Sequence, residues 1–401
     1  MDFCKQIVVS GDTTVPQGAV GVRCSNTSVS LPSSVRAVDV ASNASVSLNS
    51  GIAFYRGWPS QISGSLPSSL RWLSTQQSVD GNNLSPNNGL ITIGYSAFEG
   101  RICMSGNHNS TIPKSVKFIA DRAYRNSLIS GVVKCKTPFI EGNAFEYCSG
   151  ITSFNFDVSD VENTNSYILN PFFTYKEYCD GYHDGWKGPA IQDFPLKSIF
   201  LKGYEWVDLD MIRYGNLSTI PRLNKIEIIG NGNTKIGWIR NEDEEYDPYM
   251  HGSQDPYDGG CECSLFANEV IIGDGVKTLC STIMAVVPDP DPVYPDIPST
   301  AHPDRYNKAA RNTRIRLGKD IENIFYTHIV FPIEGEHDYW SFYTERLEIT
   351  KDDGIMLPNE TSENINKIFG GCTAIYVPSK VYQAYLAADN WSGMASRINS
   401  Y

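Results

Sequence analysis

Acidic side chains gather in two stretches of the chain where carboxylate chemistry is conceivable. Asp180 and Asp184 flank His183, and residues 242–258 carry many closely spaced carboxylates. A glycosidase needs two carboxyl groups at a defined separation, which a sequence does not reveal. Because acidic pairs in loops are far more often solvated than catalytic, we expect neither stretch to be an active site.

The motifs of other common catalytic centres are missing from the sequence. It has no Gly-x-Ser-x-Gly and no His-Glu-x-x-His, and Gly230-Asn-Gly-Asn-Thr-Lys235 lacks the Gly-Lys-Ser/Thr ending of a phosphate-binding loop. The six histidines show no mutual spacing that suggests a site. We therefore predict a protein that is not an enzyme and uses no cofactor.

Two stretches contain residue types that bind metals. Cys261 and Cys263, with His251 nearby, fall short of the four ligands and the two-residue gap usual in structural zinc sites. The carboxylates of residues 242–258 suit calcium, but their spacing matches neither an EF-hand nor a nonapeptide calcium repeat. We predict no metal, with 242–258 as a solvated or protein-contact loop and calcium as the alternative.

Aromatic side chains in polar or glycine-rich surroundings are the stronger functional signal. Flat rings stack on sugar faces and anchor protein interfaces. We select five of these residues as candidate binding residues: Tyr182, Trp186, Tyr246, Tyr249 and Tyr257. Trp58, Trp72 and Trp340 have similar surroundings. The alternative for each ring is partial burial between a repeat and an insertion.

Two short motifs recur in the first 160 residues and predict the architecture. The first occurs as Leu31-Pro-Ser-Ser-Val35, Leu66-Pro-Ser-Ser-Leu70 and Ile112-Pro-Lys-Ser-Val116, each followed three residues later by an apolar residue. The second ends in an Ala-aromatic pair, at Phe98, Tyr124 and Phe145, about 26 and about 21 residues apart. Repeats of this length indicate a solenoid, in which each unit buries its apolar edge against its neighbours. We expect the three rings to form one buried column.

Aliphatic triplets continue the pattern in the second half of the chain. They are Ile199-Phe-Leu201, Ile226-Glu-Ile228, Val270-Ile-Ile272, Ile315-Arg-Leu317 and Leu347-Glu-Ile349. Alternation places the two aliphatic side chains of a triplet on one face of a strand, and Gly273-Asp-Gly275 and Gly318-Lys-Asp320 supply turns. We predict that these strands and residues 374–377 form one continuous sheet, with unrelated strands of an ordinary β-rich domain as the alternative.

These motifs resemble a known family. Ile-x-x-x-Ala-Phe followed by Ile-Pro-x-Ser-Val-x-x-Ile is similar to the BspA-like leucine-rich repeat of gut bacteria, their phages and some protozoa. The stretch from Phe369-Gly-Gly-Cys372 to Asn390-Trp391 resembles the closing strand and terminal helix of such arrays. The resemblance covers residues 86–155 and 366–398, and the chain departs from it in its long insertions and in lacking the usual Cys-x-x-Leu. It implies a β-rich solenoid used for adhesion, display or binding, with irregular insertions and a C-terminal capping helix.

We expect four zones along the chain. Residues 1–85 are an N-terminal β-segment that starts the solenoid, and residues 86–160 are the clear leucine-rich repeats. Residues 161–268 are degenerate repeats with aromatic and acidic insertions. Residues 269–401 are degenerate repeats that end in a capping helix near 379–388. A proline-rich stretch at 288–295 predicts a second projecting loop, because proline cannot donate to a strand ladder.

Composition restricts the partners. With 33 basic and 45 acidic residues the formal net charge is −12, which argues against nucleic acid and against an anionic membrane surface. The first ten residues predict a strand rather than a secretory signal or a membrane-inserted helix. The ten cysteines are scattered, so we expect most to be reduced core residues.

These features favour a non-enzymatic phage virion protein: a fibre, spike or decoration subunit that is assembled in the host cytoplasm and released by lysis. The expected partners are other virion proteins or further copies of the chain, a trimer by analogy with phage fibres, and a glycan or protein of the host cell surface. A bacterial cell-surface adhesin is the alternative function. A polysaccharide-degrading enzyme is a third hypothesis.

Overall fold

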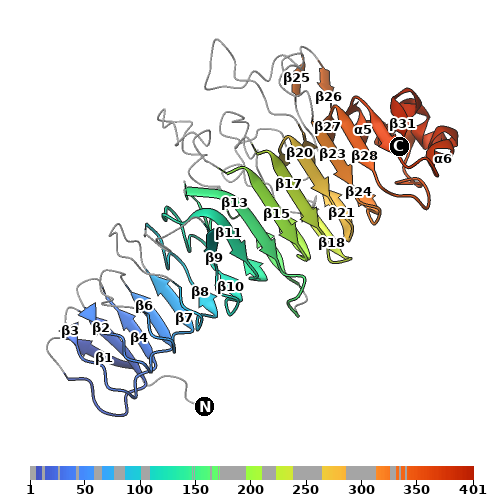
Figure 1. Cartoon of the computed structure of the whole chain (residues 1–401). Helices are drawn as coiled ribbons and strands as arrows, with labels where there is room; N and C mark the ends of the chain where they lie inside the picture. Colours follow the sequence, from blue (N-terminus) through green and yellow to red (C-terminus); the bar gives the residue numbers. More distant parts are fainter. Residues whose placement is uncertain are drawn as a thin grey trace, which may run out of the picture. The chain divides into compact units, whose positions relative to one another are not determined.

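The structure, a computed structural model, describes residues 6–10, 14–25, 28–41, 45–57, 66–75, 86–100, 109–146, 148, 150–162, 165–169, 171, 196–209, 223–237, 264–285, 313–325, 331–333, 336–338 and 341–401. These residues form mostly parallel β-sheet, with two long sheets and few helices (Figure 1). The fold is therefore β-rich and solenoid-like, as predicted. The chain divides into two compact units: unit 1 is residues 1–161 with 168–174, and unit 2 is residues 162–167 with 175–401.

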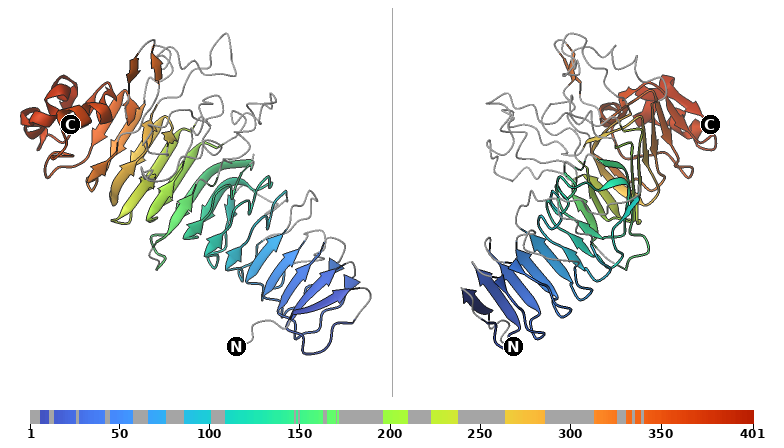
Figure 2. Two further views of the ribbon diagram at one scale, coloured as in Figure 1. Left: turned by 180° about the vertical axis from the view of Figure 1, so that it is seen from behind. Right: turned by 60° about the vertical axis from the view of Figure 1, so that its left-hand side comes forward.

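Unit 1 contains a long parallel sheet and two smaller groups of strands. The long sheet has the order β1 (Gln6–Ser10), β2 (Gly21–Ser25), β4 (Ala37–Val40), β6 (Phe54–Gly57), β7 (Trp72–Thr75), β8 (Thr92–Ile93), β10 (Phe118–Ile119) and β12 (Phe139–Ile140). A second parallel sheet contains β9 (Asn109–Thr111), β11 (Ser130–Cys135) and β13 (Gly150–Asp157), and β3 (Ser28–Val29) pairs with β5 (Ser45–Val46). Both views in Figure 2 show the blue strands of this unit side by side. The strand predicted at the start of the chain is β1.

The Pro-Ser-Ser motif makes a turn that leads into each strand. The amide of Val35 donates to the carbonyl of Pro32 at 3.0 Å, and Leu70 and Pro67 repeat this bond at 2.9 Å. Every apolar position predicted to be internal in the three copies of the motif is buried: Leu31, Val35, Val38, Leu66, Leu70, Leu73, Ile112, Val116 and Ile119. The motif thus sets one turn and three core positions per repeat.

The Ala-aromatic motif builds the predicted column of rings. Phe98 stacks on Tyr124 with ring centroids 5.2 Å apart, and Tyr124 stacks on Phe145 at 5.1 Å. All three rings are buried. Each copy of the motif has a residue with a positive φ two positions before the aromatic residue: Ser96, Arg122 and Asn143. The prediction of one buried aromatic column is confirmed.

A column of alternating charge runs beside the rings, because each aromatic residue is followed by a charged one. Arg125 Nε lies 2.9 Å from Glu146 Oε2, and Arg125 Nη1 lies 3.7 Å from Glu99 Oε1. The side chain of Glu146 is only 3% exposed. A buried carboxylate persists only when a counter-charge compensates its lost hydration, so Arg125 lets two acidic residues occupy this column.

Unit 2 repeats the parallel arrangement. Its main sheet has the order β15 (Ser198–Lys202), β17 (Lys225–Ile229), β20 (Glu269–Ile272), β23 (Arg314–Leu317), β28 (Arg346–Ile349), β30 (Ile375–Val377) and β31 (Ile398–Ser400). The predicted triplets therefore do lie side by side in one sheet.

The remaining strands of unit 2 form smaller ladders. These are β16 (Trp206–Asp208), β18 (Thr234–Gly237), β21 (Val276–Cys280) and β24 (Asn323–Ile324) in one ladder, and β19 (Ser264–Phe266), β22 (Thr282–Met284), β27 (Phe342–Thr344) and β29 (Gly371–Cys372) in another. Two further strands, β25 (Phe331–Ile333) and β26 (Glu336–Asp338), pair antiparallel. The chain passes between the two units at β14 (Tyr167–Leu169).

Glycine turns stack above one another between neighbouring strands of unit 2. A Cβ atom added at Gly230 would lie 2.1 Å from the backbone carbon of Gly275, and one at Gly318 would lie 2.5 Å from that of Gly273. Gly275 also has φ +83°. Glycine is required here by close backbone approach, in agreement with the predicted turns at 273–275 and 318–320.

Helices cover the C-terminal end of the core. They are α5 (Ser362–Phe369), α6 (Tyr382–Ala387) and a 3-10 helix (Asp389–Arg397). Phe369 stacks between Phe342 and Trp391, with centroids 5.5 and 5.1 Å apart. The helix predicted near 379–388 is present as the shorter α6. Sequence analysis missed α5, and it also missed β31, which forms the edge of the main sheet after the helices.

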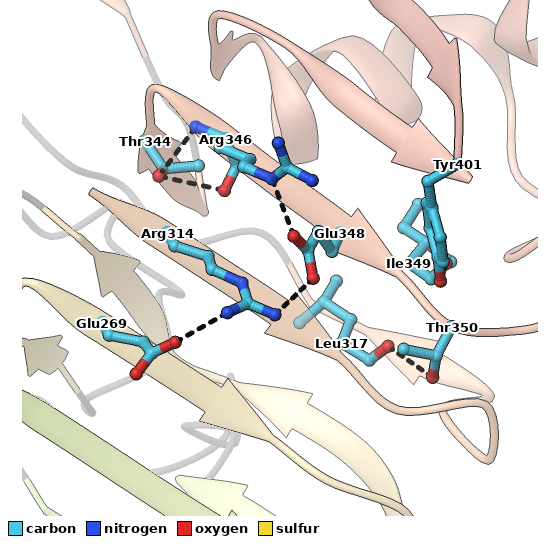
Figure 3. Close-up of polar contacts among 9 residues, drawn as sticks. All are labelled: Glu269, Arg314, Leu317, Thr344, Arg346, Glu348, Ile349, Thr350 and Tyr401. Carbon is cyan, nitrogen blue, oxygen red and sulfur yellow. Dashed lines mark hydrogen bonds and ion pairs between the residues drawn. The ribbon is translucent and has the colours of Figure 1, made fainter. Parts of the chain in front are cut away.

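One face of the main sheet of unit 2 carries a ladder of ion pairs (Figure 3). Arg314 on β23 lies 3.0 Å from Glu269 on β20 and 2.6 Å from Glu348 on β28. Arg346 contacts Glu348 at 2.7 Å and lies over the ring of Tyr376, 4.0 Å from its centroid. Opposite charges on neighbouring strands thus largely neutralise each other.

Truncation of a ring in the aromatic column tests whether this column is core. Phe98→Ala is expected to lower the free energy of unfolding by about 3–5 kcal/mol, because the cavity left by a buried ring is not refilled. Tyr95→Ala is the matched control, since Tyr95 belongs to the same turn but is 42% exposed; its loss is expected to stay within about 0.5 kcal/mol. Urea titration measures both values. Equal losses would contradict the buried column.

The ion-pair ladder predicts a pH-dependent part of the stability of unit 2. Burial alone would raise the pKa of Glu348, but hydrogen bonds from Arg314 and Arg346 outweigh it and hold the pKa below the ordinary value of 4.5. A carboxyl with a depressed folded-state pKa stabilises the fold above its unfolded pKa, and this contribution is lost as the pH falls through the folded-state pKa. Glu348→Gln should therefore lose less stability than wild type as the pH falls below 4.5. Parallel urea-unfolding curves over that range would refute the prediction.

Candidate functional site

The candidate binding residues selected from the sequence lie outside the described residues. This holds for Tyr182, Trp186, Tyr246, Tyr249 and Tyr257, and also for Asp180, His183, Asp184, Cys261, Cys263 and the stretches 242–258 and 288–295. Of the other aromatic residues singled out, Trp72 is described and is half-buried on β7. Trp72 is part of a different candidate site, which lies on the long sheet of unit 1.

Strands β4, β6, β7, β8 and β10 of that sheet each begin with a corner, in which two consecutive amides donate to one carbonyl, that of the residue before the preceding strand. Arg36 N and Ala37 N both donate to Val20 O, at 2.8 and 3.1 Å. The pattern recurs from Ala53 and Phe54 to Arg36, from Arg71 and Trp72 to Ala53, from Ile91 and Thr92 to Arg71, and from Lys117 and Phe118 to Ile91. Because two amides share one carbonyl, the strict alternation of inward and outward side chains is interrupted. Two consecutive side chains of each corner therefore lie outside the core.

The second residue of the corner forms a row of aromatic side chains across the sheet. Phe54 is in register with Trp72, Thr92 lies between Trp72 and Phe118, and Phe118 is in register with Phe139. The residue after each of them is fully buried: Tyr55, Leu73, Ile93, Ile119 and Ile140. Because successive side chains of a strand face opposite ways, the four rings lie on the outer face. We call Phe54, Trp72, Phe118 and Phe139 the aromatic row.

The rings of the aromatic row are only partly covered by the protein. Phe54 is 50% exposed, and the other three rings are half-buried. Neighbouring strands are about 4.8 Å apart, so the row crosses four steps and spans about 19 Å. Exposed aromatic rings in a line are more typical of a binding surface than of a neutral one, because burying them against a ligand is strongly favourable.

The first residue of the corner adds positive charge beside the aromatic row. Arg36, Arg71 and Lys117 are exposed and occupy every second strand, while Val20, Ala53 and Ile91 occupy the strands between them. We call Arg36, Arg71 and Lys117 the corner cations. Unit 1 contains 12 Lys and Arg against 10 Asp and Glu, so with a whole-chain charge of −12 the excess of negative charge lies in unit 2.

The same corner in unit 2 carries one exposed ring. Glu205 N and Trp206 N both donate to Ser166 O at 3.0 Å, and Trp206 is 38% exposed. Its indole Nε1 donates to Gly237 O at 3.0 Å. On one side Trp206 is in register with Lys235, and on the other side lies β14, which begins with the half-buried Tyr167.

Buried thiols do not contribute a nucleophile to the described part of the chain. Cys24, Cys135, Cys148 and Cys372 are free, and these four and Cys280 are buried, as expected for reduced core residues. Burial raises the pKa of Cys24 and Cys135 to about 11 and that of Cys148 to about 12. A thiol with such a pKa is almost entirely protonated at neutral pH, and only the thiolate is reactive.

The described residues also lack a metal-binding cluster and a helix suited to cross a membrane. No group of three or more His, Cys, Asp or Glu side chains in this part of the chain is arranged to hold a metal ion. None of the described helices has the length and apolar composition needed to cross a membrane. The aromatic row with its corner cations is the most prominent candidate site that remains.

Sequence analysis missed most of this site, although its signal is present. Phe54, Trp72, Phe118 and Phe139 each directly precede a residue whose side chain is buried, so an aromatic residue recurs at one fixed place in the repeat. Only Trp72 was singled out. Comparison of the sequence with protein-family models gives no match, and a search of curated proteins gives no match either.

Proposed function

We propose that this chain is a non-enzymatic recognition protein that attaches to a glycan of a bacterial cell surface, with the aromatic row as its contact surface. The observation that carries the proposal is the in-register alignment of Phe54, Trp72, Phe118 and Phe139 on the outer face of a parallel sheet. A row of rings at one spacing suits a polymer with a repeating flat unit, because the same contact is made several times. Sugar rings present such apolar faces.

We further propose a place for the protein in a phage particle, as a fibre, spike or decoration subunit of a phage that infects gut Bacteroidetes. The support is the resemblance of residues 86–155 and 366–398 to BspA-like leucine-rich repeats, together with the solenoid-like fold. A fold alone does not establish a function, so the resemblance supports the scaffold and the aromatic row supports the ligand. In this proposal the protein resides in the virion and contacts other virion proteins.

A bacterial cell-surface adhesin is the second candidate. The aromatic row favours it equally, since an adhesin and a phage fibre both need repeated weak contacts with a polymer. The two candidates differ in where the protein is found. Mass spectrometry of purified particles and of washed host cells separates them: peptides of this chain in particles support the virion, and peptides confined to the cell envelope support the adhesin.

Binding to capsulated cells tests the role of the aromatic row. Fluorescently labelled protein should bind capsulated strains of gut Bacteroidetes, and Trp72→Ala or Phe54→Ala should weaken binding by about 1–3 kcal/mol per ring. Tyr95→Ala, which removes an exposed ring outside the row, should bind like wild type. Equal effects of all three substitutions would refute the assignment, and release of reducing sugar by the wild-type protein would overturn the non-enzymatic proposal.

Self-association is the second prediction from the proposed function. Virion subunits are usually symmetric oligomers, and we expect a trimer by analogy with phage fibres. The edge strand β1 is a natural contact, since its outer side is at the end of the long sheet. Multi-angle light scattering measures the mass in solution. A monomer of 44.5 kDa at micromolar concentration, together with absence from purified particles, would remove the virion proposal.

A further inference from the structure

The corner cations directly precede β4, β7 and β10, and the aromatic row runs from β6 to β12, so the two features overlap on one sheet and their periods differ by a factor of two. Aromatic rings or Thr92 occur at every strand from β6 to β12, whereas Arg36, Arg71 and Lys117 occur before β4, β7 and β10 only. We propose that this face binds an extended anionic polysaccharide that carries a carboxylate on about every second sugar. This inference rests on the proposed function and specifies the ligand of the same site.

Spacing is the first argument for this ligand. One strand step is about 4.8 Å, which is close to the length of one pyranose ring in an extended chain. The corner cations are therefore about 9.6 Å apart, close to the length of a disaccharide repeat. A polymer lying across the strands would place successive sugars over successive strands of the row and the carboxylate of each disaccharide beside a cation.

The charge state of the corner cations is the second argument. The guanidinium of Arg71 donates from Nη1 to the carbonyls of Ser68 at 2.7 Å and Gly89 at 3.1 Å. Arg36 repeats this arrangement with the carbonyl of Ser33. Carbonyl groups are neutral, so these bonds fix the position of the guanidinium without cancelling its charge. A fixed cation loses little side-chain entropy when an anion binds.

Glycine keeps the space that each guanidinium occupies. A Cβ atom at Gly89 would lie 2.5 Å from Arg71 Nη1, and a Cβ atom at Gly51 would lie 2.3 Å from Arg36 Nη1. The glycine in the turn before the following strand therefore leaves the room that the guanidinium occupies. Two repeats share this arrangement, which indicates that the position of the charge is built into the repeat.

Other charges on the outer face do not oppose an anionic ligand. Arg56 is exposed on the same strand and face as Phe54 and adds to the positive charge. Asp39 is paired with Arg23 at 3.6 Å, and Glu141 accepts a hydrogen bond from the amide of Asp121 at 3.0 Å. The ion pair compensates the charge of Asp39, and the remaining charge of Glu141 is outnumbered by Arg36, Arg56, Arg71 and Lys117.

Single-stranded nucleic acid is the other polymer that combines flat rings with negative charge, and the geometry favours it less. Its backbone carries a phosphate at every nucleotide, and binding proteins match it with a continuous positively charged groove. Here every second strand has an apolar residue at the corner: Val20, Ala53 and Ile91. A sparse row of cations fits a sparsely charged polymer.

The test compares two charge reversals that differ only in location. Lys117→Glu reverses a corner cation, and Lys134→Glu reverses an exposed lysine on β11, in the second sheet of unit 1. The probes are hyaluronan, which has one carboxylate per disaccharide, hyaluronan with its carboxyls reduced to alcohols, and single-stranded oligothymidine. Binding is measured by isothermal titration calorimetry at low and high salt, with thermal unfolding to confirm that each variant is folded.

The proposal predicts at least tenfold tighter binding of hyaluronan than of its carboxyl-reduced form, and loss of this preference at high salt. Lys117→Glu should lower hyaluronan affinity at least tenfold, and Lys134→Glu by less than twofold. Equal binding of both hyaluronan forms, equal effects of the two reversals, or tighter binding of oligothymidine would each overturn the inference.

Two variants separate failure of this inference from failure of the proposed function. If Trp72→Ala abolishes binding to capsulated cells while Lys117→Glu leaves it unchanged, the glycan site stands and its anionic specificity is wrong. If neither wild type nor variants bind capsulated cells or either hyaluronan form, the proposed function fails with it. Arg71→Lys keeps the charge but loses the two fixed carbonyl contacts, so a small loss there and a large loss in Arg71→Gln would support charge as the cause.

Discussion

In-register parallel pairing is the constraint on which the rest of this structure depends. When neighbouring strands pair parallel without a shift, equivalent residues of successive repeats lie about 4.8 Å apart in columns. Phe98, Tyr124 and Phe145 stack because their strands keep this relation. The side chains within each column must therefore tolerate close contact with one another. Rings stack, glycines allow the backbones to approach, and charges either alternate in sign or lie in solvent.

Charged residues satisfy this constraint in two ways, and the first of them, alternation in sign, also occurs in unit 1 at Glu99, Arg125 and Glu146. In unit 2, Glu269, Arg314 and Glu348 alternate in sign across neighbouring strands and neutralise each other. In unit 1, the corner cations are separated by apolar residues, and the hydrogen bonds of Arg36 and Arg71 go to carbonyl groups. The first arrangement stabilises a sheet. The second leaves charge unbalanced on the surface, a cost to stability that proteins commonly accept where they bind a ligand.

Sequence reasoning reached the parts of the fold that local chemistry specifies. The Pro-Ser-Ser turns, the Ala-aromatic column and the aliphatic triplets each combine a turn signal with apolar spacing, so their buried positions could be predicted. The helix α5 was missed although Thr361 caps its first turn by accepting a hydrogen bond from Asn364 N at 3.1 Å. The sequence pattern of this helix is short. The helix also follows a long series of strand repeats, which favours the prediction of another strand. The edge strand β31 follows two helices and has one buried residue, Ile398, which is too little to recognise.

The outer face was harder to predict, because hydrophobic periodicity reports what is buried. A ring at Phe54 or Phe118 looks like part of the core when its neighbour Tyr55 or Ile119 is apolar as well. Only the corner, where two amides share one carbonyl, shows that one of two consecutive apolar residues faces outward. The binding residues predicted from the sequence belong to insertions. The repeat pattern does not predict where the side chains of an insertion lie.

Thr92 divides the aromatic row into two pairs of rings, and this division affects how a polymer can bind. Phe54 with Trp72 and Phe118 with Phe139 are each in register on adjacent strands, whereas Thr92 leaves one step without a ring. Two short contacts on one rigid sheet need no linker to stay at a fixed separation, so engaging the second pair costs little additional entropy once the first is bound. A flexible polymer would have to adopt an extended conformation to reach both pairs. In the proposed binding mode, the rigidity of the sheet therefore selects for chain conformation as well as for chemistry, and a compact glycan would engage only one pair.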